Sequence, residues 1–473
     1  KARCNPVGEG TPPMIGLLGL ALLYGIAFAL SENRSAVSLR LVAWGLSLQV
    51  ALGLLIIRTD WGTALFSAMG DGVHAMLVFA DQGSLFVFGQ AADPNGSLGS
   101  VFAFRVLPIV IFISALFSVL YYMGIMQRIV LLMAKTMHRL MGVSGSESLA
   151  AAANVFMGQT EAPIIVAPYI SAMTRSELMA LMTTGMATVS GAVLGAYIAL
   201  GIRPEYLLSA SVMAAPAALV MAKLLIPETE QSKTAGNVML EVEPTDVNVI
   251  DSAARGAGQG ITLALNIGGM LIAFLAIIYM IDGILALIGN AFASVQSFLT
   301  MLVIIGSIAI AYALGWGPPP KTRQMVLATT GALIIVAVGI FMVRGASPIS
   351  FGLRPILATI FAPLAFLTGV PWAEAGTVGE LFGIKLMLNE FVAYTELSVL
   401  LAEETLSPKS ELIASYALCG FANFASIGIQ IGGIGSLAPS RRSDLARLGL
   451  RAVMAGMLAS LTVATLAGIL SSF

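Results

Sequence analysis

The most constraining feature of this sequence is a series of apolar stretches, each long enough to cross a lipid bilayer as a helix. A helix needs about 20 mainly apolar residues to span the hydrocarbon core, and few charges can lie inside it. Such stretches occupy residues 14–30, 41–58, 106–124, 177–200, 205–225, 259–289, 297–314, 324–342, 411–434 and 446–470. The sequence therefore predicts an all-α polytopic membrane protein.

The composition supports this class and excludes others. Hydrophobic residues make up 58% of the 473 residues and charged residues only 10%, whereas soluble domains are roughly one quarter charged. With 24 basic and 25 acidic residues, the chain has no basic excess for binding nucleic acid. The only cysteines, Cys4 and Cys419, cannot form a disulfide framework or a thiolate metal site.

Three further segments of the chain need separate interpretation. The run Met14 to Leu30 is too long for a signal peptide and lacks a small-residue cleavage site, so we expect a true span. Residues 60–100 mix Gly and Asp with apolar residues, which predicts a helix and a loop on the outer surface. Residues 228–256 are hydrophilic and predict a solvated linker that ends in an amphipathic helix.

Arginine and lysine clusters set the expected orientation, because short cytoplasmic loops carry the positive excess. Placing every cluster inside agrees with the order of the spans and puts both termini outside. Lys1 and Arg3 lie at the outer end against this rule and are treated as a short tail. The clusters are Arg34 with Arg40, Arg128 with Lys135 and Arg139, Lys321 with Arg323, and Arg441 with Arg442, Arg447 and Arg451.

Two stretches of the chain, residues 126–195 and 352–435, repeat the same order of features. Each has a Gly-Val dipeptide, an apolar segment broken by a glutamate-containing cluster, a Ser-Glu-Leu tripeptide and a second broken apolar segment. The matching elements are Gly142-Val143 with Gly369-Val370, Met157 to Pro163 with Leu388 to Val392, Ser176-Glu177-Leu178 with Ser410-Glu411-Leu412, and Gly185 to Gly191 with Gly420 to Ser426. Internal symmetry of this kind indicates a transporter.

The spans between the copies predict how they are related. If residues 354–369 do not cross the membrane, the second copy enters from the opposite side, and the repeats have inverted topology. Each copy then contributes one re-entrant helical hairpin and one broken transmembrane helix. Helix ends inside the bilayer are tolerated only where they line a cavity or bind something. The expected organisation is scaffold spans and an outer segment at 1–125, a first transport repeat at 126–225, a linker, scaffold span and inserted helical pair at 226–345, and a second repeat with the final span at 346–473.

Glu161 and Glu390 are the leading candidate site residues. At membrane depth a carboxylate costs at least ~2.5 kcal/mol unless it is paired or solvated, so such residues indicate ligand or ion contact. The alternative is that both hairpins are interfacial loops with solvated glutamates. Lys385, about one turn before Glu390, is interpreted as its structural counter-charge. Four polar residues beside the breaks are further candidates for the site: Asn154, Thr188, Asn423 and Ser426.

These motifs make the sequence resemble the concentrative nucleoside transporter family from about residue 100 onward. The motifs that carry the resemblance are Gly158 to Pro163, Ala187 to Gly191, Asn248 to Ala257, Asn389 to Tyr394, Phe421 to Phe424, and Ser426 to Gly428. The resemblance implies a homotrimer in which each protomer has a scaffold and a mobile transport domain. It implies nucleobase contacts by Gln159, Thr160 and Glu161 with Val193 beside them. It also implies ribose contacts by Glu390, Asn423 and Ser426, with Phe421 packing near the ligand.

The resemblance also implies a sodium ion between the first hairpin and the first broken helix. Its ligands would be the side chains of Asn154 and Thr188 and the carbonyls of Met157 and Val189. The chain departs from the usual bacterial pattern of the family in one respect: it has an inserted pair of apolar segments at 297–314 and 324–342. The chain lacks the extra amino-terminal spans of animal members, which points to a bacterial-type protein of the inner membrane.

The expected function is import of nucleosides by alternating access, driven by a sodium gradient and without a further cofactor. Proton coupling stays open because Glu161 could titrate, and the preference between purine and pyrimidine nucleosides also stays open. A passive channel fits inverted repeats with broken helices less well than a transporter does. An intramembrane hydrolase is disfavoured because His74 and His138, the only histidines, lie far from both glutamate motifs.

Overall fold

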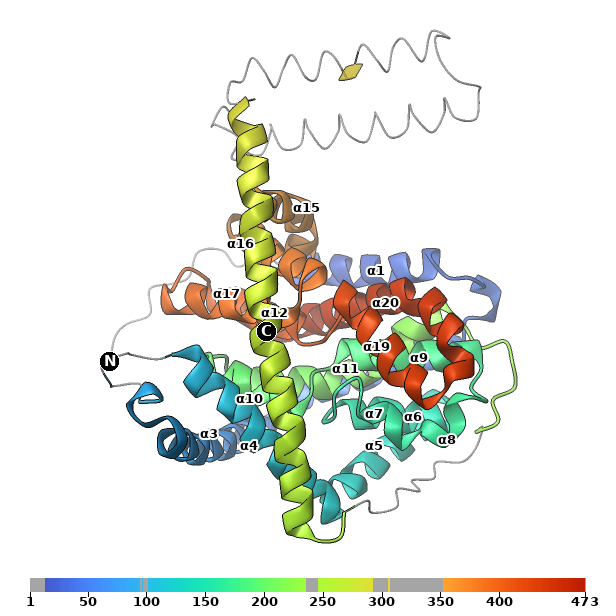
Figure 1. Cartoon of the computed structure of the whole chain (residues 1–473). Helices are drawn as coiled ribbons and strands as arrows, with labels where there is room; N and C mark the ends of the chain where they lie inside the picture. Colours follow the sequence, from blue (N-terminus) through green and yellow to red (C-terminus); the bar gives the residue numbers. More distant parts are fainter. Residues whose placement is uncertain are drawn as a thin grey trace. The chain divides into compact units, whose positions relative to one another are not determined.

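The computed structural model describes residues 13–93, 96, 101–234, 246–291, 305–306 and 352–472. Every regular element in these residues is a helix, which confirms the all-α prediction (Figure 1). In chain order the helices are α1 (Pro13–Ala29), η1 (Arg34–Ala36), α2 (Leu39–Arg58), α3 (Asp60–Phe88), η2 (Gly89–Ala91), α4 (Phe102–Tyr122), α5 (Ile125–Met141), α6 (Gly145–Asn154), α7 (Ala162–Ile165), α8 (Ala167–Ile170), α9 (Arg175–Ala187), α10 (Gly191–Ala199), α11 (Pro204–Leu225), α12 (Val249–Ala291), α15 (Leu353–Leu367), α16 (Trp372–Met387), α17 (Glu390–Ala402), α18 (Pro408–Leu418), α19 (Phe424–Leu437), η3 (Pro439–Arg441) and α20 (Arg442–Leu470).

The chain forms two units. The first unit is Lys1–Ala273 with Phe361–Phe473, and the second is Phe274–Ile360. Within the second unit, the carboxylate of Asp282 accepts a hydrogen bond from the backbone nitrogen of Leu353 at 2.6 Å. The inserted apolar pair predicted at 297–314 and 324–342 lies outside the described residues, except for positions 305 and 306.

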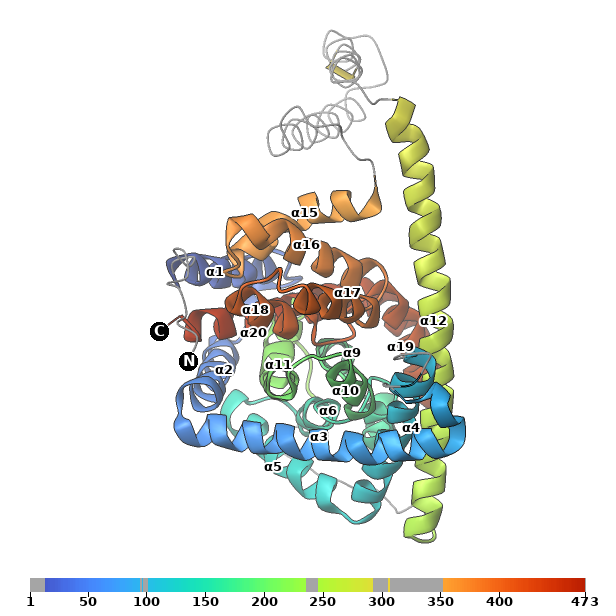
Figure 2. The ribbon, with the colours of Figure 1, turned by 90° about the vertical axis from the view of Figure 1, so that its left-hand side faces the viewer.

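The interior of the first unit is built from α9, α11, α18 and α20, which pack against one another (Figure 2). α11 and α20 are buried along almost their whole lengths, and Ala, Gly and Ser make up much of their contact surfaces. In contrast, α2, α3 and α4 are buried over only a minor part of their lengths, and α2 and α3 expose large apolar side chains such as Trp44 and Phe79. Small residues let helix backbones approach closely, while exposed apolar faces suit a lipid surrounding.

The helices agree with most predicted spans. Seven described helical segments, with α9 and α10 counted as one, are long and apolar enough to cross a membrane, and the bent pair α15 with α16 raises this to up to eight. The segment 60–100, predicted to hold a helix and a loop on the outer surface, contains the 29-residue helix α3, which has the length and composition of a span. The amphipathic helix expected at the end of the linker is continuous with the following span, because α12 begins at Val249.

The repeated Gly-Val dipeptides end corresponding helices. Gly142 follows α5 with φ +70°, and Gly369 follows α15 with φ +104°. Glycine adopts this left-handed conformation without the steric cost paid by other residues, and it therefore ends helices. A hairpin follows each glycine, α6 to α8 in the first copy and α16 with α17 in the second. α15 and α16 differ in direction by 116°, so residues 353–367 do not continue straight into the second hairpin.

Both predicted broken helices are interrupted where expected. The first break separates α9 from α10 at residues 188–190, and the second separates α18 from α19 at residues 419–423. The two breaks touch, since a Cβ at Gly420 would lie 2.8 Å from the carbonyl oxygen of Ala187. Gly420 also has φ +133°. Glycine is therefore required there both for backbone conformation and for the close approach of the two broken helices.

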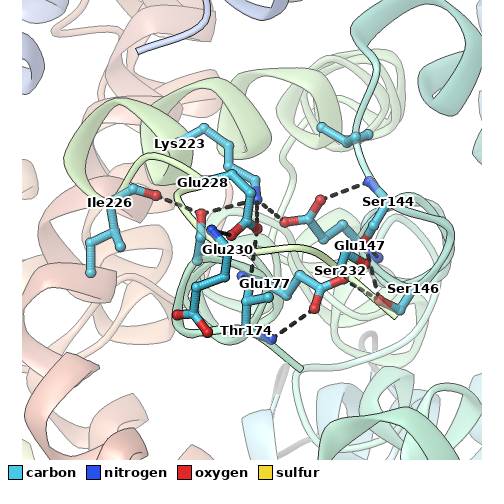
Figure 3. A network of polar contacts seen from close by, with 12 residues as sticks. Ser144, Ser146, Glu147, Thr174, Glu177, Lys223, Ile226, Glu228, Glu230 and Ser232 are labelled. Atoms are coloured by element: carbon cyan, nitrogen blue, oxygen red, sulfur yellow. Dashed lines mark hydrogen bonds and ion pairs between the residues drawn. The ribbon is translucent and has the colours of Figure 1, made fainter. Parts of the chain in front are cut away.

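A polar network joins the starts of α6 and α9 to the end of α11 (Figure 3). Lys223 of α11 forms ion pairs with Glu147 of α6 and Glu228 of the following linker, and it donates to Ser176 of α9 at 2.9 Å. The Lys223 and Glu147 side chains are 7% and 1% exposed. Both charges are therefore shielded from solvent, and each needs its ion-pair partner to offset the cost of burial.

The same network caps two helices. Ser144 with Glu147 and Thr174 with Glu177 form capping boxes, in which each residue satisfies a backbone N–H at the start of α6 or α9. Ser232 of the linker donates to Glu177 at 2.5 Å. Residues 226–234 therefore pack against the base of the first repeat rather than forming a fully solvated segment.

Candidate functional site

Both breaks and the second hairpin leave the start of a helix inside the first unit, and a polar residue caps each of these starts. The Ser190 hydroxyl accepts from Val193 N at the start of α10, and Asn389 Oδ1 accepts from Val392 N at the start of α17. Asn423 Oδ1 accepts from Ser426 N at the start of α19. Short polar side chains are preferred at these positions because they satisfy free backbone donors. The helix starts also carry partial positive charge, which favours anionic or oxygen-rich groups nearby.

Hydrogen bonds connect predicted site residues from both repeats. Asn423 Nδ2 donates to Glu390 Oε2 at 2.9 Å, and Gln159 Nε2 donates to Ser426 Oγ at 3.0 Å. Because Asn423 Oδ1 holds the backbone nitrogen of Ser426, these contacts form one continuous chain. The structure thus brings Gln159 of the first repeat together with Glu390, Asn423 and Ser426 of the second.

Glu390 lies in a mainly aromatic surrounding. Tyr197 of α10 donates its hydroxyl to Glu390 Oε1 at 3.2 Å. The Tyr197 ring packs against Tyr394 and Phe391, with ring centroids 4.2 Å and 5.3 Å apart. Glu390 itself is only 5% exposed. Its two carboxylate oxygens are therefore each held by a protein donor, one from each repeat.

Lys385 interacts electrostatically with Glu390, as expected of a counter-charge, but its hydrogen bonds in the described structure are to other groups. Its amine donates to the Ala417 carbonyl at 2.8 Å and to Ser460 at 3.2 Å. Ala417 lies in the last turn of α18, where the partial negative charge of a helix end attracts a cation. Lys385 therefore fixes the end of α18 at the second break.

The first hairpin loop places Thr160 and Glu161 beside Gln159. Glu161 Oε2 is buried without a hydrogen-bond partner in the described structure. A Cβ at Gly158 would overlap this carboxylate, so glycine leaves room for it in the present position. Thr160 lies against α19, where a Cβ at Gly433 would be 3.1 Å from Thr160 Cγ2. The unpartnered oxygen is available to an external donor.

Val193 and Phe421 stand at the two breaks. Val193 is buried in the first turn of α10, four residues before Tyr197 and so on the same helix face. Phe421 is half-buried, and its carbonyl accepts from Asn423 N at 2.9 Å. Phe421 thus shapes the turn that presents Asn423.

Asn154 and Thr188, two of the predicted sodium ligands, lie where α6 ends and at the first break, and both bond to Thr184. A backbone hydrogen bond of 2.9 Å from Gly191 N to Phe156 O holds these segments together. Asn154 Nδ2 donates to the Ala150 carbonyl at 3.0 Å, and because a carbonyl only accepts, this fixes the orientation of the amide. Asn154 Oδ1 is consequently left buried without a partner in the described structure.

Thr188 is the second side chain of the predicted sodium site. Its hydroxyl donates to Thr184 O at 2.9 Å and keeps its own lone pairs free. Together with the unpartnered Asn154 Oδ1, it offers neutral oxygen ligands of the type that hard cations accept. The residues present therefore fit a small cation.

Sequence reasoning missed Tyr197 and Gln430, although helix spacing could have found both. Tyr197 follows Val193 by four residues in α10, and Gln430 follows Ser426 by four residues in α19. Residues four apart share a helix face. Gln430 is fully buried and donates to Gln159 Oε1 at 3.1 Å.

An apolar bundle with a repeated pattern of hairpins and broken helices, whose helix starts surround buried polar side chains, defines a secondary transporter. Comparison with family models agrees. The model for the C-terminus of Na+ dependent nucleoside transporters matches residues 206–328 and 321–468, and the N-terminus model matches residues 18–91. A nucleoside recognition model matches residues 103–203. The chain belongs to the Na+-dependent nucleoside transporter family.

Similar proteins span nearly the whole chain. The uncharacterized transporter YutK of Bacillus subtilis is 42% identical over 96% of this chain and 98% of its own length. Sodium/nucleoside cotransporter 1 of Mus musculus is 40% identical over 97% of this chain, which spans 64% of that longer protein.

Solved structures are similar over the same extent. The transporter CNTnw in an inward-facing substrate-bound state is 38% identical with a TM-score of 0.79, covering 97% of this chain and 98% of that chain. A CNTnw variant in an outward-facing state has a TM-score of 0.82 at the same identity and coverage. The family therefore includes alternating-access structures. Its members are transporters, so the hydrolase alternative is excluded.

Proposed function

We propose that this protein imports nucleosides across the cell membrane by symport with Na+. The observation that carries the proposal is the hydrogen-bonded chain from Gln159 to Glu390, which joins the two repeats. One end offers an amide with both donor and acceptor for a base edge. The other offers a carboxylate that accepts hydrogen bonds from vicinal hydroxyls. A nucleoside combines a base with a ribose, and so has groups that match both ends.

Residues next to this chain complete the proposed substrate site. Thr160 and Glu161 would contact the nucleobase with Gln159, and the buried unpartnered Glu161 Oε2 supports this role. Val193 would pack beside the base and Phe421 beside the ligand. A ribose hydroxyl would take over one of the donor positions at Glu390 now held by Tyr197 and Asn423.

Na+ would be held by the side chains of Asn154 and Thr188 with the carbonyls of Met157 and Val189. The ion supplies the electrochemical gradient that drives uptake and, when bound, a positive charge beside the first break. The orphaned Asn154 Oδ1 supports this assignment. Coupling to protons through Glu161 is the second candidate, favoured by the burial of that carboxylate without a partner.

We further propose a homotrimer in a bacterial inner membrane. Each protomer would have a scaffold and a mobile transport domain that contains both hairpins and both broken helices. The exposed apolar side chains of α2 and α3 support a surrounding of lipid and neighbouring protomers.

Uptake into proteoliposomes tests the function. We expect radiolabelled uridine to accumulate above equilibrium when an inward Na+ gradient is imposed, and to stop accumulating when the gradient is dissipated. Accumulation driven instead by an inward proton gradient would show that protons are the coupling ion and would assign their binding to Glu161. Uridine that only equilibrates under every gradient would identify a passive channel. A competition panel of purine and pyrimidine nucleosides then ranks the substrates.

Replacing Glu390 tests the ribose assignment. Glu390→Gln keeps the size of the side chain but removes its charge, and hydrogen bonds to charged groups contribute about 1.5 to 3 kcal/mol each. We therefore expect uridine uptake at low concentration to fall about tenfold or more, while the oligomer seen by size-exclusion chromatography is retained. Near-normal uptake by this variant would contradict the ribose role.

A further inference from the structure

Gln430 is a buried amide that none of the transport roles above includes. It lies in α19 one turn after Ser426, and its side chain is 0% exposed. It reaches the first repeat, where its nitrogen lies 3.0 Å from the carbonyl oxygen of Met182 in α9 and 3.1 Å from Gln159 Oε1. Gln430 is therefore a polar link between the second broken helix and the first hairpin loop.

The contact with Met182 fixes the direction of every hydrogen bond in this link. A backbone carbonyl can only accept, so the NH2 group of Gln430, and not its oxygen, must face Met182. The second N–H of that group donates to Gln159, which must present its oxygen to Gln430. The NH2 group of Gln159 is thereby directed towards Ser426 Oγ at 3.0 Å.

Tight packing holds this arrangement. A Cβ at Gly185 of α9 would lie 2.9 Å from the Gln430 amide nitrogen and 3.0 Å from Gln159 Cβ. Gly433, three residues after Gln430 and on the same helix face, similarly gives room to Thr160. Two glycines, one from each broken helix, let α9 and α19 close around the hairpin loop. Gln159 is consequently held by its neighbours on both sides.

The direction of the Gln159 amide matters because nucleobases differ in hydrogen-bond polarity. Uracil presents a carbonyl acceptor at position 4 and an N–H at position 3, whereas cytosine presents an amino donor and a ring-nitrogen acceptor. Turning a glutamine amide by 180° exchanges its donor and acceptor. An amide that turns freely can match either base, and a fixed amide matches only one of them well.

We propose that Gln430 is a specificity-determining positioning residue, which fixes the polarity of the Gln159 amide and so makes the transporter discriminate between nucleobases of opposite hydrogen-bond polarity. The inference rests on the proposed nucleobase role of Gln159. Gln430 acts through Gln159 and not by touching the base. It belongs to neither glutamate motif.

Gln430→Met is the informative substitution. Methionine has a similar length and flexible shape but no N–H donors. The Gln430 oxygen is already buried without a partner in the described structure, so its loss removes an unsatisfied acceptor and favours retention of the fold.

The experiment measures how strongly unlabelled uridine and cytidine inhibit Na+-driven uptake of a labelled nucleoside that both displace. These competitors share the ribose and differ only in base polarity. For the unsubstituted protein we expect half-inhibitory concentrations that differ by at least about fivefold, since a matched base edge is favoured by that much or more. For Gln430→Met we expect the ratio to move towards one. The ratio between uridine and 2′-deoxyuridine, which reports on the ribose, should stay constant.

Gln49→Met is the matched control. Gln49 of α2 is also 0% exposed and also donates to a backbone carbonyl, that of Gly45 at 3.1 Å. This variant should keep the uridine to cytidine ratio of the unsubstituted protein. A ratio near one in the unsubstituted protein, or an unchanged ratio in Gln430→Met, overturns the inference alone. Absence of any uptake that nucleosides inhibit overturns the proposed function and this inference with it.

Discussion

At the scale of single residues, the site is defined by which polar atoms are satisfied and which are not. Glu390 has a protein donor on each carboxylate oxygen. Asn154 Oδ1 and Glu161 Oε2 are buried and have none in the described structure. Buried polar atoms in native proteins nearly always have partners, so these two indicate places where an ion or a ligand supplies the missing contact.

Asn154→Ala and Thr188→Val test the ion ligands. Loss of one contact to a charged group costs about 1.5 to 3 kcal/mol, so we expect the Na+ concentration for half-maximal uridine uptake to rise about tenfold or more. The order of preference among nucleosides should not change. The measurement is initial uptake rate as a function of external Na+ in proteoliposomes.

Thr462→Val is the control for Thr188→Val. Thr462 is equally buried in α20, and its hydroxyl donates to the carbonyl four residues earlier, as that of Thr188 does. Its replacement should leave the Na+ dependence unchanged. Equal shifts in both threonine variants would assign the effect to helix packing instead of ion binding.

At the scale of elements, a few short features decide how the helices meet. Glycines with positive φ end α5 and α15, and Gly420 lets the two breaks touch. Capping boxes start α6 and α9 beside the buried Lys223. The first hairpin, the first broken helix and α11 are thereby tied together at one end, so we expect this end to resist local unfolding.

Lys223→Met tests that tie. Removing the cation leaves the Glu147 carboxylate, whose side chain is 1% exposed, without its ion-pair partner. Breaking a buried pair in this way costs about 3 to 5 kcal/mol. We expect a clearly lower temperature of thermal unfolding in detergent, followed by the intrinsic fluorescence of the protein.

The exposed ion pair Arg203 with Glu205 provides the comparison, because its side chains are 54% and 29% exposed. Arg203→Ala should change stability by less than about 1 kcal/mol. If both variants unfold alike, the buried network does not stabilise the fold as inferred.

At the scale of the whole molecule, the repeats predict a motion. Two copies of opposite orientation can exchange conformations, which moves the transport unit against the scaffold. The moving unit would comprise residues 128–200 and 372–436. In the present structure α10 packs on α4, which belongs to the proposed scaffold, and a Cβ at Gly195 would lie 3.0 Å from Ile113.

Crosslinking tests the motion. In a background without Cys4 and Cys419, the pair Ile113→Cys with Gly195→Cys should crosslink to an extent that changes when Na+ and uridine are added. The control pair Ser118→Cys with Ser252→Cys joins α4 to α12 within the scaffold, where the two hydroxyls lie 3.3 Å apart. Its crosslinking should not depend on ligands. Full transport after crosslinking of the first pair would show that the unit does not move as a whole.

The sequence by itself determined the helical class, the positions of the breaks and the repeat. These follow from local properties: apolar length for the spans, glycine and capping residues for the helix ends, and buried glutamates for the site. Such signals act within a few residues. Most described helices therefore begin and end close to the positions that the sequence predicts.

Only the tertiary structure decided which polar groups face each other. Lys385 lies close to Glu390 in sequence, yet it binds the end of α18 and Ser460. Tyr197 and Gln430 carry no motif, yet each bonds to a site residue more than 190 positions away. A hydrogen bond depends on distance and direction at the level of an ångström. Hydrophobic pattern and helix spacing do not fix these quantities between helices far apart in the chain.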